Sequence, residues 1–211
     1  MPKVLMTGGS GFLGNNIAKM LLERNYLVSN LINRSSSLEL TEYEGYEELA
    51  IKGLHKTSDF DIILHCATSY GRDNSSYTKV FEPNLYLPLQ LLIERMHNSE
   101  PYFFINIDTT LEATTSQYAL SKSLFLSSAE QLIKEYQPRN LKFINIKLEH
   151  FYGSGAPSHN FITYLVNSMQ ENTLKINLTL GEQERDFIYV KDAVNAISVI
   201  VEEAKNFQNM I

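Results

Sequence analysis

The sequence predicts an α/β protein built on a doubly wound parallel sheet, and three observations lead to this prediction. Short apolar runs of β-forming residues alternate with longer runs in which Ile, Leu and Ala recur at helical spacing. The short runs are continuously apolar, which is typical of strands that are buried on both faces. The regular alternation of the two kinds of run favours parallel strands with helices on both sides of the sheet.

The expected elements can be placed along the chain from these patterns. The predicted strands are residues 3–6, 27–32, 61–65, 102–107, 142–148 and 187–190. The predicted helices are residues 15–24, 85–97, 118–136, 161–169 and 192–204. Residues 35–58 are predicted only as a connection that contains a strand and a helix.

Length and composition limit the classes of protein to consider. At 211 residues the chain can form one well-buried domain with a small appendage, but not two full-sized domains. A composition of 44% hydrophobic and 20% charged residues excludes the disordered and fibrous classes. The formal net charge of −6 gives no general electrostatic reason to bind nucleic acid or an anionic membrane. An anionic ligand would therefore have to be held by a local pocket.

Cysteine usage and the N-terminus bear on the cellular compartment. Cys66 is the single cysteine and cannot form an internal disulfide, and no Cys/His cluster has zinc-like spacing, so no metal site is expected. The glycine-rich segment begins within a few residues of Met1, so no signal peptide is expected before it. No apolar run reaches the roughly 18 residues needed to span a bilayer. These observations predict a soluble, cytoplasmic protein.

A glycine-rich segment joins the first predicted strand to the first predicted helix, with the sequence Thr-Gly-Gly-Ser-Gly-Phe-Leu-Gly at residues 7–14. Glycine permits a tight turn, lets the backbone approach a pyrophosphate, and lets the following helix pack closely on the strand. The helix N-terminus adds free N–H groups and the positive end of the helix dipole. A structural turn is the alternative, but the position between strand and helix favours dinucleotide binding. The residues expected at the cofactor are Gly8, Gly11, Phe12, Leu13 and Gly14.

The end of the second predicted strand bears on the choice between NAD and NADP. An acidic residue is expected there, about 20 positions beyond the glycines, if the adenosine ribose is bound through its 2′-hydroxyl. The sequence has Ile-Asn-Arg-Ser at residues 32–35 instead. Because no carboxylate would repel a 2′-phosphate and Arg34 is next to Asn33, both residues are expected at the cofactor and NADP is favoured over NAD. The alternative is that Arg34 is a solvated loop cation.

Tyr118 and Lys122 lie four residues apart, which places a phenol and an ammonium on one face of a helix. The ordinary pKa of tyrosine is about 10, and an adjacent cation is expected to lower the pKa of Tyr118. Tyr118 could then exchange a proton with a substrate while hydride passes to or from a nicotinamide. The spacing alone is common, and it gains weight from the preceding strand, which ends in Asp108-Thr109-Thr110.

Taken in order along the chain, these motifs resemble those of extended short-chain dehydrogenases/reductases of the nucleotide-sugar epimerase/dehydratase type. The resemblance covers nearly the whole chain, and it depends on the series of motifs because no single motif would suffice. It implies a Rossmann-type dinucleotide-binding domain over residues 1–150 and a small, incomplete substrate-binding lobe over residues 151–211, packed on that domain. The matching motifs are the glycine loop, His65-Cys66-Ala67, Asn84, Thr109, Tyr118 with Lys122, Tyr152-Gly153 and the run Arg-Asp-Phe-Ile-Tyr-Val-Lys-Asp at residues 185–192.

The resemblance also implies roles for individual residues at the reacting centre. Thr109 would hydrogen-bond the reacting oxygen of the substrate, with Thr110 as the alternative one place along. Tyr118 would be the acid/base, and Lys122 would also hold the nicotinamide ribose. The strand end formed by Cys66, Ala67 and Thr68 would lie against the cofactor, where Cys66 is expected to be a packing residue and not a nucleophile.

Asn84 matches a helix asparagine whose main-chain carbonyl, in the wider superfamily, is linked through water to the lysine. Pro88 lies four residues later and has no N–H, so it cannot bond to that carbonyl in an α-helix. A kink that frees the Asn84 carbonyl is therefore expected. The alternative is a helix that starts only after Pro83 or Pro88.

Four further residues are expected at the substrate by the same resemblance. His150 occupies a position where relatives contact the nicotinamide or a substrate phosphate, with a structural histidine as the alternative. Asn160 and Phe161 resemble a pair that meets the nucleotide portion of the substrate. Arg185 would pair with the diphosphate, as its fork geometry allows, or alternatively with a structural carboxylate.

Three departures from the family pattern bear on the reaction and the substrate site. Thr109 is followed by Thr110-Leu111-Glu112, whereas dehydratases of this family carry Asp-Glu there, so dehydration is disfavoured. The loop between Thr109 and Tyr118 has only eight residues, which suggests a more open site on that side. Relatives usually continue beyond the equivalent of Ile211, so this member is either shorter or lacks part of the substrate lobe.

The resemblance therefore implies NAD(P)-dependent oxidoreduction at a sugar carbon, C4, of a nucleotide-diphosphate-sugar, by a 4-ketoreductase or a 4-epimerase of deoxysugar and surface polysaccharide synthesis. The alternative is a non-catalytic dinucleotide-binding sensor or partner subunit. A homodimer is expected through the helices that carry Asn84 and Tyr118. The candidate outer-face residues of those helices are Leu89, Leu92, Met96, Leu124, Phe125 and Leu132.

Overall fold

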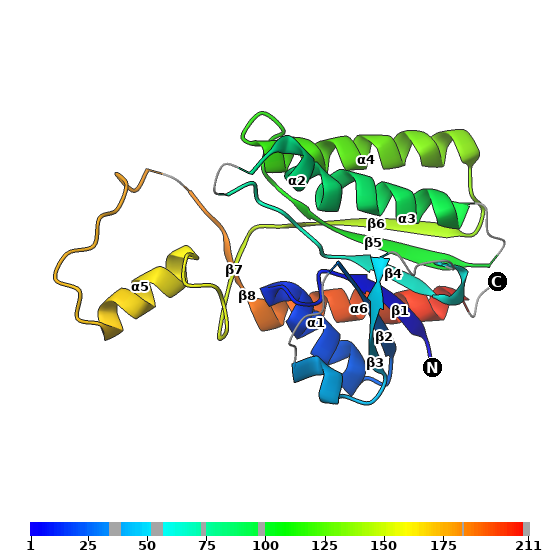
Figure 1. The fold of residues 1–211 in the computed structure, drawn as a ribbon, viewed down its shortest axis with the longest axis horizontal. Helices are drawn as coiled ribbons and strands as arrows, with labels where there is room; N and C mark the ends of the chain where they lie inside the picture. Colours follow the sequence, from blue (N-terminus) through cyan, green and yellow to red (C-terminus); the bar gives the residue numbers. More distant parts are fainter. Residues whose placement is uncertain (34–38, 52–56, 73–74, 97–99, 183, 209–211) are drawn as a thin grey trace.

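The computed structural model describes residues 1–33, 39–51, 57–72, 75–96, 100–182 and 184–208. Six parallel strands form the main sheet, with helices on both of its faces (Figure 1). These strands are β1 (Lys3–Thr7), β2 (Leu27–Ile32), β3 (Tyr46–Ala50), β4 (Ile62–His65), β5 (Tyr102–Thr109) and β6 (Leu141–Leu148). The predicted parallel α/β architecture is confirmed.

The strand order is β3-β2-β1-β4-β5-β6, which is the Rossmann arrangement. The order reverses direction between β1 and β4, which pair with Thr7 opposite His65. In such sheets ligands bind outside the carboxyl ends of the strands at this reversal. The topology therefore places the glycine loop after β1 and the strand end after β4 at the expected ligand crevice.

Two apolar layers hold the helices on the sheet. One layer packs α1 (Phe12–Glu23) and α6 (Val190–Gln208) against one face, with Ile17, Leu21 and Ile197 fully or almost fully buried. The other packs α3 (Leu87–Met96) and α4 (Gln117–Tyr136) against the opposite face, with Leu92 and Phe125 completely buried. Leu92 and Phe125 therefore face the sheet, so their prediction as outer-face residues was wrong. Leu124 is exposed, as an outer-face residue should be.

The helix before β5 begins earlier than predicted and contains a π-helical turn. Helical structure starts at α2 (Tyr77–Phe81), passes through η4 (Glu82–Tyr86) and continues as α3. In the π turn the Leu87 N–H donates to the Glu82 carbonyl, five residues back. The missing N–H of Pro88 explains why the α-helical pattern is interrupted here. The predicted distortion at Asn84 is confirmed, and the alternative of a helix starting after Pro83 or Pro88 is wrong.

Residues 35–58 were predicted as a connection with a strand and a helix, and the described part of this region and its end at Asp59 contain a strand and two 3₁₀ turns. These are the 3₁₀ turn η1 (Glu39–Glu42), the edge strand β3, and the 3₁₀ turn η3 (Thr57–Asp59). The strand has only half-buried and exposed residues, because it lies at the edge of the sheet. Its sequence, Tyr-Glu-Glu-Leu-Ala, accordingly lacks the continuous apolar pattern of the central strands.

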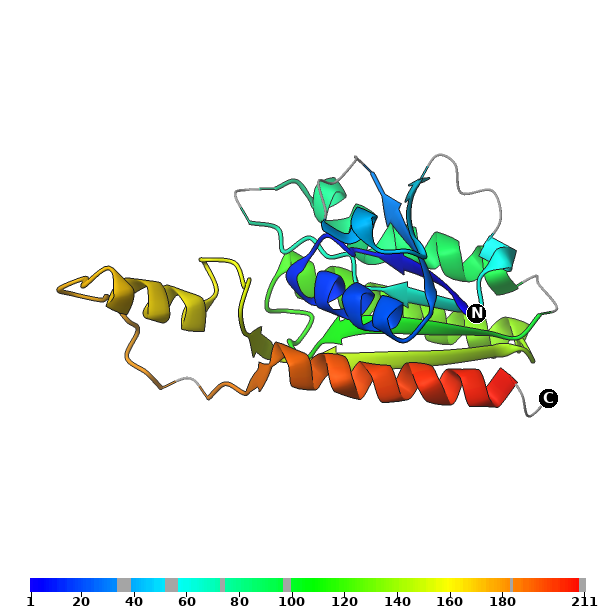
Figure 2. The same cartoon turned by 90° about the horizontal axis from the view of Figure 1, so that it is seen from below.

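Beyond β6 the chain leaves the main sheet and then returns to it. A small parallel ribbon joins β7 (His150–Tyr152) to β8 (Phe187–Tyr189), and α5 (Phe161–Gln170) stands beyond the carboxyl ends of the strands (Figure 2). Figure 2 also shows α6 lying along the same face of the sheet as α1. The segment between β7 and β8 is thus the part that projects as a lobe, whereas α6 packs on the main sheet. The domain boundary at residue 150 stays a prediction.

Among the described residues no helix is both long and apolar enough to cross a bilayer. Within the same residues no three side chains of His, Cys, Asp or Glu are grouped as a metal site would require.

Candidate active site

The glycine loop is shaped by contacts that leave no room for side chains. Gly8 has a φ of 75°, and a Cβ on it would lie 2.5 Å from the backbone nitrogen of Ala67 at the end of β4. A Cβ on Gly14 would lie 2.1 Å from the Gly8 carbonyl oxygen. The loop is therefore pressed between the first turn of α1 and the end of β4. No side chain caps α1 at Gly11, so the helix N-terminus keeps its N–H groups available for a ligand.

Polar side chains fix this loop from the neighbouring strands. The Asn30 side-chain oxygen accepts a hydrogen bond from the Gly9 N–H at 3.0 Å. The Thr7 hydroxyl accepts from the Ala67 N–H at 3.1 Å and lies 2.7 Å from Nδ1 of His65. Burial holds the pKa of His65 well below its usual value, and the nearby Lys122 adds to this effect. A neutral His65 thus ties the end of β1 to the end of β4.

A cavity of about 820 Å³ opens at these strand ends, a volume within the range of small-molecule sites. Its walls come from the glycine loop, the ends of β4, β5 and β6, the first turn of α4, and the start of α5. Most predicted site residues line it, namely Gly8, Gly11, Phe12, Leu13, Gly14, Cys66, Ala67, Thr68, Thr109, Tyr118, His150, Asn160 and Phe161. The fold therefore brings the predicted cofactor and substrate residues to one cavity.

Tyr118 lies in the first turn of α4, whose N-cap Ser116 accepts a hydrogen bond from the Ala119 N–H at 3.1 Å. Lys122 is one turn further on and is 1% exposed. Its Nζ donates to the Ile107 carbonyl at 2.8 Å. Thr109 lines the cavity at the end of β5, whereas the Thr110 hydroxyl donates to Glu149. Of the two threonines, Thr109 therefore has the geometry expected of the residue at the reacting oxygen.

The protonation state of Tyr118 differs from the sequence-based expectation. Burial raises the pKa of Tyr118 to about 12, and a hydrogen bond with Thr109 only partly offsets this. Tyr70 and Asp108 raise the Tyr118 pKa further. Burial lowers the pKa of Lys122 to about 8, opposed mainly by Asp108. The expectation that Lys122 lowers the Tyr118 pKa was wrong, because it considered the cation and not the loss of water around the phenol.

Asn84 connects three parts of the site through one side chain, and it is completely buried. Its oxygen accepts from the Ser69 N–H at 2.9 Å, and its amide nitrogen donates to the Ser69 carbonyl at 2.8 Å. The same nitrogen donates at 2.9 Å to the Ser121 hydroxyl, which in turn donates to the Tyr118 carbonyl at 2.7 Å. Asn84 thus joins the π turn, the loop after β4 and the first turn of α4. Its predicted water link to Lys122 stays a prediction.

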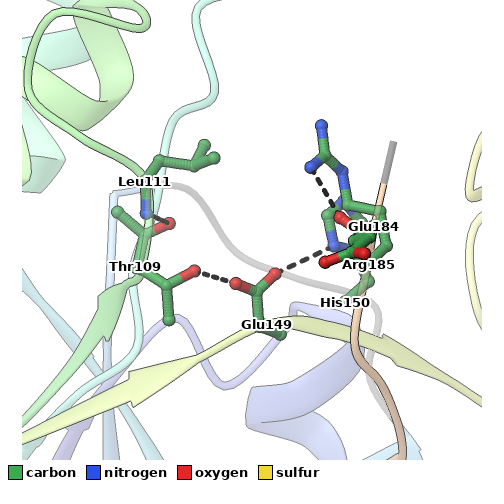
Figure 3. A network of polar contacts seen from close by, with 7 residues as sticks. Thr109, Leu111, Glu149, His150, Glu184 and Arg185 are labelled. Atoms are coloured by element: carbon green, nitrogen blue, oxygen red, sulfur yellow. Dashed lines mark hydrogen bonds and ion pairs between the residues drawn. The ribbon is translucent and has the colours of Figure 1, made fainter. Parts of the chain in front are cut away.

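The opposite wall of the cavity carries Glu149 and His150. Figure 3 shows the Glu149 carboxylate between the end of β5 and the His150 ring. Nδ1 of His150 lies 3.3 Å from a Glu149 carboxylate oxygen, and the ring lies 5.7 Å from that of Phe187 on β8. Phe187 also stacks with Phe161 at 6.1 Å. His150 therefore has both a carboxylate neighbour and an aromatic neighbour at the cavity.

The remaining predicted residues lie elsewhere or are not described. Asn33 is exposed after β2 and does not line the cavity, and Arg34 lies outside the described residues. Arg185 is exposed, and its guanidinium donates to the Glu184 carbonyl at 3.0 Å (Figure 3). Among the described residues Arg185 therefore pairs neither with a carboxylate nor with the cavity wall. Its proposed contact with a diphosphate stays a prediction.

Residues that were not predicted also line the cavity, among them Tyr70, Arg72 and Glu149. A signal existed for the first two, because they follow a predicted strand whose carboxyl end reaches the ligand crevice. Glu149 carried a similar signal at the end of the last central strand. Their side-chain directions depend on loop geometry, which residue type alone does not show.

The comparisons with known proteins agree with this geometry. Residues 4–210 match the model of the NAD dependent epimerase/dehydratase family. The chain is 30% identical over 212 aligned residues to the CDP-abequose synthase of Salmonella muenchen, which covers 97% of this chain and 71% of that protein. Family membership thus rests on nearly the whole of the chain.

Solved structures share the fold at low sequence identity. The UDP-glucuronic acid 4-epimerase of Bacillus cereus, in complex with UDP-glucuronic acid and NAD, superposes with a TM-score of 0.73 at 21% identity, covering 95% of this chain and 73% of that one. The dTDP-glucose 4,6-dehydratase of Bacillus anthracis, in complex with NAD, gives a TM-score of 0.76 at 20% identity, covering 97% and 72%. Motif order, topology and sequence similarity together show that the chain belongs to the NAD dependent epimerase/dehydratase family.

Proposed function

We propose that this protein reduces a keto group, at C4, of a nucleotide-diphosphate-sugar, or interconverts epimers at that carbon, with a nicotinamide dinucleotide as cofactor. The observation that carries the proposal is that the glycine loop, Thr109 and Tyr118 line one cavity. The buried Lys122 lies one helical turn beyond Tyr118. The glycine loop can bind a pyrophosphate, and Tyr118 can carry a proton at the same strand ends. This arrangement suits a reaction that couples hydride transfer to proton transfer.

The residues at the strand ends fit a dinucleotide. A Cβ on Gly8 or Gly14 would clash with the neighbouring backbone, so the glycine loop can adopt its tight path only without side chains at these positions. The loop lies next to the uncapped N-terminus of α1. The loop and the helix would hold the pyrophosphate, Cys66, Ala67 and Thr68 would lie along the cofactor, and Lys122 would reach the nicotinamide ribose. When bound, the reduced cofactor supplies a hydride to the carbonyl carbon.

Tyr118 is suited to donating a proton. Because its pKa is raised to about 12, the phenol is protonated at neutral pH. A protonated phenol can give its proton to the carbonyl oxygen of a ketone, while the Thr109 hydroxyl donates a hydrogen bond to the same oxygen. The first step of an epimerase instead requires a base that takes a proton from a hydroxyl. The protonated phenol of the free protein is thus in the state that ketoreduction uses, whereas the oxidation step of an epimerase would first have to remove that proton.

The wall opposite Tyr118 would hold the rest of the substrate. His150, Asn160 and Phe161 lie at the start of the projecting lobe and line the cavity. The CDP-abequose synthase of Salmonella muenchen is named for a CDP-linked sugar product. A cytidine or thymidine diphosphate 4-keto-6-deoxyhexose is accordingly the substrate we would test first.

The direct test is a turnover assay with matched variants. Wild-type protein with NADPH and a CDP- or dTDP-4-keto-6-deoxyhexose should oxidise NADPH, whereas Tyr118→Phe should lose roughly 10²–10⁴-fold of that rate. Tyr118→Phe should bind NADPH as tightly as wild type, because the ring and Lys122 remain, whereas Lys122→Met should weaken both binding and turnover. NADPH binding without turnover of any 4-keto or 4-hydroxy nucleotide-sugar would favour the non-catalytic sensor or partner subunit.

We also propose a preference for NADP, since Asn33 and Arg34 stand where a carboxylate would repel the 2′-phosphate. Fluorescence titration should give a lower Kd for NADPH than for NADH. Arg34→Glu should reverse the order, because a carboxylate accepts from the ribose 2′-hydroxyl and repels a phosphate. Tighter NADH binding by the wild type would contradict the proposed preference.

We further propose a homodimer through the outer faces of α3 and α4. Ile93 and Leu124 are exposed on these helices, and Leu89 and Met96 are partly buried. Sedimentation velocity at micromolar concentration should show a dimer that Leu124→Glu dissociates. A wild type that sediments as a monomer would contradict this arrangement.

A further inference from the structure

The loop after β4 places an aromatic ring on the candidate catalytic phenol. The ring centroids of Tyr70 and Tyr118 are 4.9 Å apart with an interplanar angle of 48°. The guanidinium carbon of Arg72 lies over the Tyr70 ring, 4.9 Å from its centroid. Tyr70, Arg72 and Tyr118 all line the cavity. Tyr70, which is 49% exposed, thus lies between Arg72 and Tyr118 along one wall, with its ring tilted against that of Tyr118.

Tyr70 is held in this place by the backbone on either side of it. Both the N–H and the carbonyl of Ser69 bond to the buried Asn84 side chain. Gly71 follows Tyr70 with a φ of 67°, a left-handed turn that redirects the chain so that Arg72 packs over the Tyr70 ring. Since Asn84 also bonds to Ser121 on α4, one side chain sets the spacing between the Tyr70 loop and the Tyr118 helix.

We propose that Tyr70 is a positioning residue for Tyr118: its ring holds the phenol in one orientation and excludes water from one of its faces, and Arg72 holds Tyr70. This inference rests on the proposed function for its catalytic meaning, but not for its structural test. Aromatic pairs at this separation contribute about 0.5–1.5 kcal/mol beyond the area they bury. A cation over a ring adds to that attraction.

The environment of Tyr118 agrees with this role. Loss of water is the largest cause of the raised pKa of Tyr118, and the negative charge of an ionised Tyr70 raises that pKa further. The described titratable or charged residues that line the cavity with Tyr118 are Cys66, Tyr70, Arg72, Asp108, Glu149, His150, Tyr152 and His159, and Lys122 is buried one helical turn beyond Tyr118. Of these, Tyr70 is the one whose ring is in contact with that of Tyr118.

The structural test follows the ionisation of Tyr118 without any substrate. Protein labelled with ¹³C at the tyrosine Cζ gives one signal per ring, and the Tyr118 signal is the one lost in Tyr118→Phe. At about pH 10.5 an ordinary tyrosine, with a pKa of about 10, is mostly ionised, whereas the Tyr118 signal should remain that of a protonated phenol. In Tyr70→Leu the Tyr118 pKa should fall by about one unit, a tenfold change in ionisation constant, because water reaches the ring.

Three variants separate this role from a general loss of structure. Tyr70→Phe keeps the ring and removes only the ionisable hydroxyl, so the Tyr118 pKa should fall by clearly less than in Tyr70→Leu. Arg72→Met should give a smaller shift in the same direction, since Tyr70 is then less firmly held. Tyr77→Leu is the matched control, because Tyr77 is an exposed tyrosine whose ring packs on Phe81 and does not line the cavity. It should change nothing.

Turnover then connects the position of Tyr118 to catalysis. Tyr70→Leu should lower kcat by about ten- to a hundredfold, as misplacement of a catalytic group does, with an unchanged Kd for NADPH. An unchanged Tyr118 titration in Tyr70→Leu, or equal shifts in Tyr70→Leu and Tyr70→Phe, would overturn the inference. If wild-type protein turns over no nucleotide-sugar but the titration shifts as expected, the proposed function fails while the positioning of Tyr118 by Tyr70 stands.

Discussion

Replacing Asn84 with leucine should destabilise the protein, and the hydrogen bonds of Asn84 set the size of the effect. Leucine branches as asparagine does and has the same number of side-chain heavy atoms, with bulkier methyl groups, so the change removes hydrogen bonds without opening a cavity. The Ser69 N–H and carbonyl both lose their side-chain partner, and the Ser121 hydroxyl loses a donor. An unsatisfied buried polar group costs about 1–3 kcal/mol.

Ser69 is half-buried, so water can replace part of what is lost there. The Ser121 hydroxyl keeps its own bond to the Tyr118 carbonyl, which limits the cost at that position. We therefore expect a loss of about 2–4 kcal/mol in the free energy of unfolding, at or just below the lower end of the roughly 3–9 kcal/mol that three fully unsatisfied groups would cost. Native domains have a total of about 5–15 kcal/mol, so this loss would be a large fraction of the total.

Urea unfolding followed by circular dichroism measures this change, with equal m-values required for the comparison. The melting temperature should fall by about 4–16 °C, at about 2–4 °C per kcal/mol for a chain of this length. Gln90→Leu is the matched control, because Gln90 is an exposed amide nearby on α3 with one surface hydrogen bond, to Glu94. It should stay within about 0.5 kcal/mol of wild type. A loss of similar size in both variants, or none in Asn84→Leu, would refute the assigned role of the network.

Three further predictions follow from buried groups and close contacts. Lys122→Met should raise the free energy of unfolding at pH 7 by about 1–3 kcal/mol, because burial has lowered the Lys122 pKa from 10.5 to about 8. Urea unfolding measures this change. A lower free energy of unfolding in the variant would contradict the prediction and show that the hydrogen bond from Lys122 to the Ile107 carbonyl outweighs the cost of burying the charge. His65 is neutral when folded, whereas the unfolded chain binds a proton below about pH 6.5, so stability should fall by up to about 1.4 kcal/mol per pH unit below that value. A flat stability between about pH 7 and 5 would contradict a buried neutral His65. Gly14→Ala should abolish NADPH binding, because its Cβ would lie 2.1 Å from the Gly8 carbonyl oxygen. Gly11→Ala should weaken binding less, because its Cβ would lie 3.3 Å from the same oxygen. Equal Kd values for NADPH in the two variants would contradict this steric explanation.

The central fold could be predicted because its signal is local and strong. The interior strands β1, β4 and β5 are buried on both faces, so their sequences are continuously apolar and their positions agree with prediction to within two residues. The glycine loop carries its own steric requirement, which the close contacts of Gly8 and Gly14 now explain. Both features follow from constraints that act on a few neighbouring residues.

The parts that were missed, or predicted without an exact position, depend on contacts between distant segments. β3 is held as a strand by pairing with β2, from Val28 opposite Tyr46 to Ile32 opposite Ala50, and its own composition does not require a strand. β7 has three residues and exists through its pairing with β8, 37 positions along at His150 and Phe187. The π turn was predicted as a distortion because proline acts locally, but its exact register depends on how Asn84 reaches Ser69 and Ser121.

The candidate site shows the same division between identity and environment. Thr109, Tyr118 and Lys122 could be selected from their order and spacing, since both follow from a strand that ends beside a helix. Tyr70 and Glu149 could not, because their place at the cavity is set by the turn at Gly71 and by the path from β6 into β7. Residue type shows what a side chain can do, and the packing around it decides which of those actions the site can use.

The protonation of Tyr118 and Lys122 illustrates how far environment changes the reading of a motif. From spacing alone, an ammonium beside a phenol predicts a lowered tyrosine pKa and a side chain that exchanges a proton with the substrate. In the structure both groups are buried, which raises the pKa of Tyr118 to about 12 and lowers that of Lys122 to about 8. Because burial disfavours the charged form of each, at neutral pH the phenol keeps its proton, and the lysine keeps its charge by a margin of only about one pH unit. A tyrosine with the ordinary pKa of about 10 would also be protonated at neutral pH, so burial reinforces this state of Tyr118 and does not create it. The proton is available for the proposed ketone reduction, and the proposed epimerisation would require the phenol to lose it in its oxidation step.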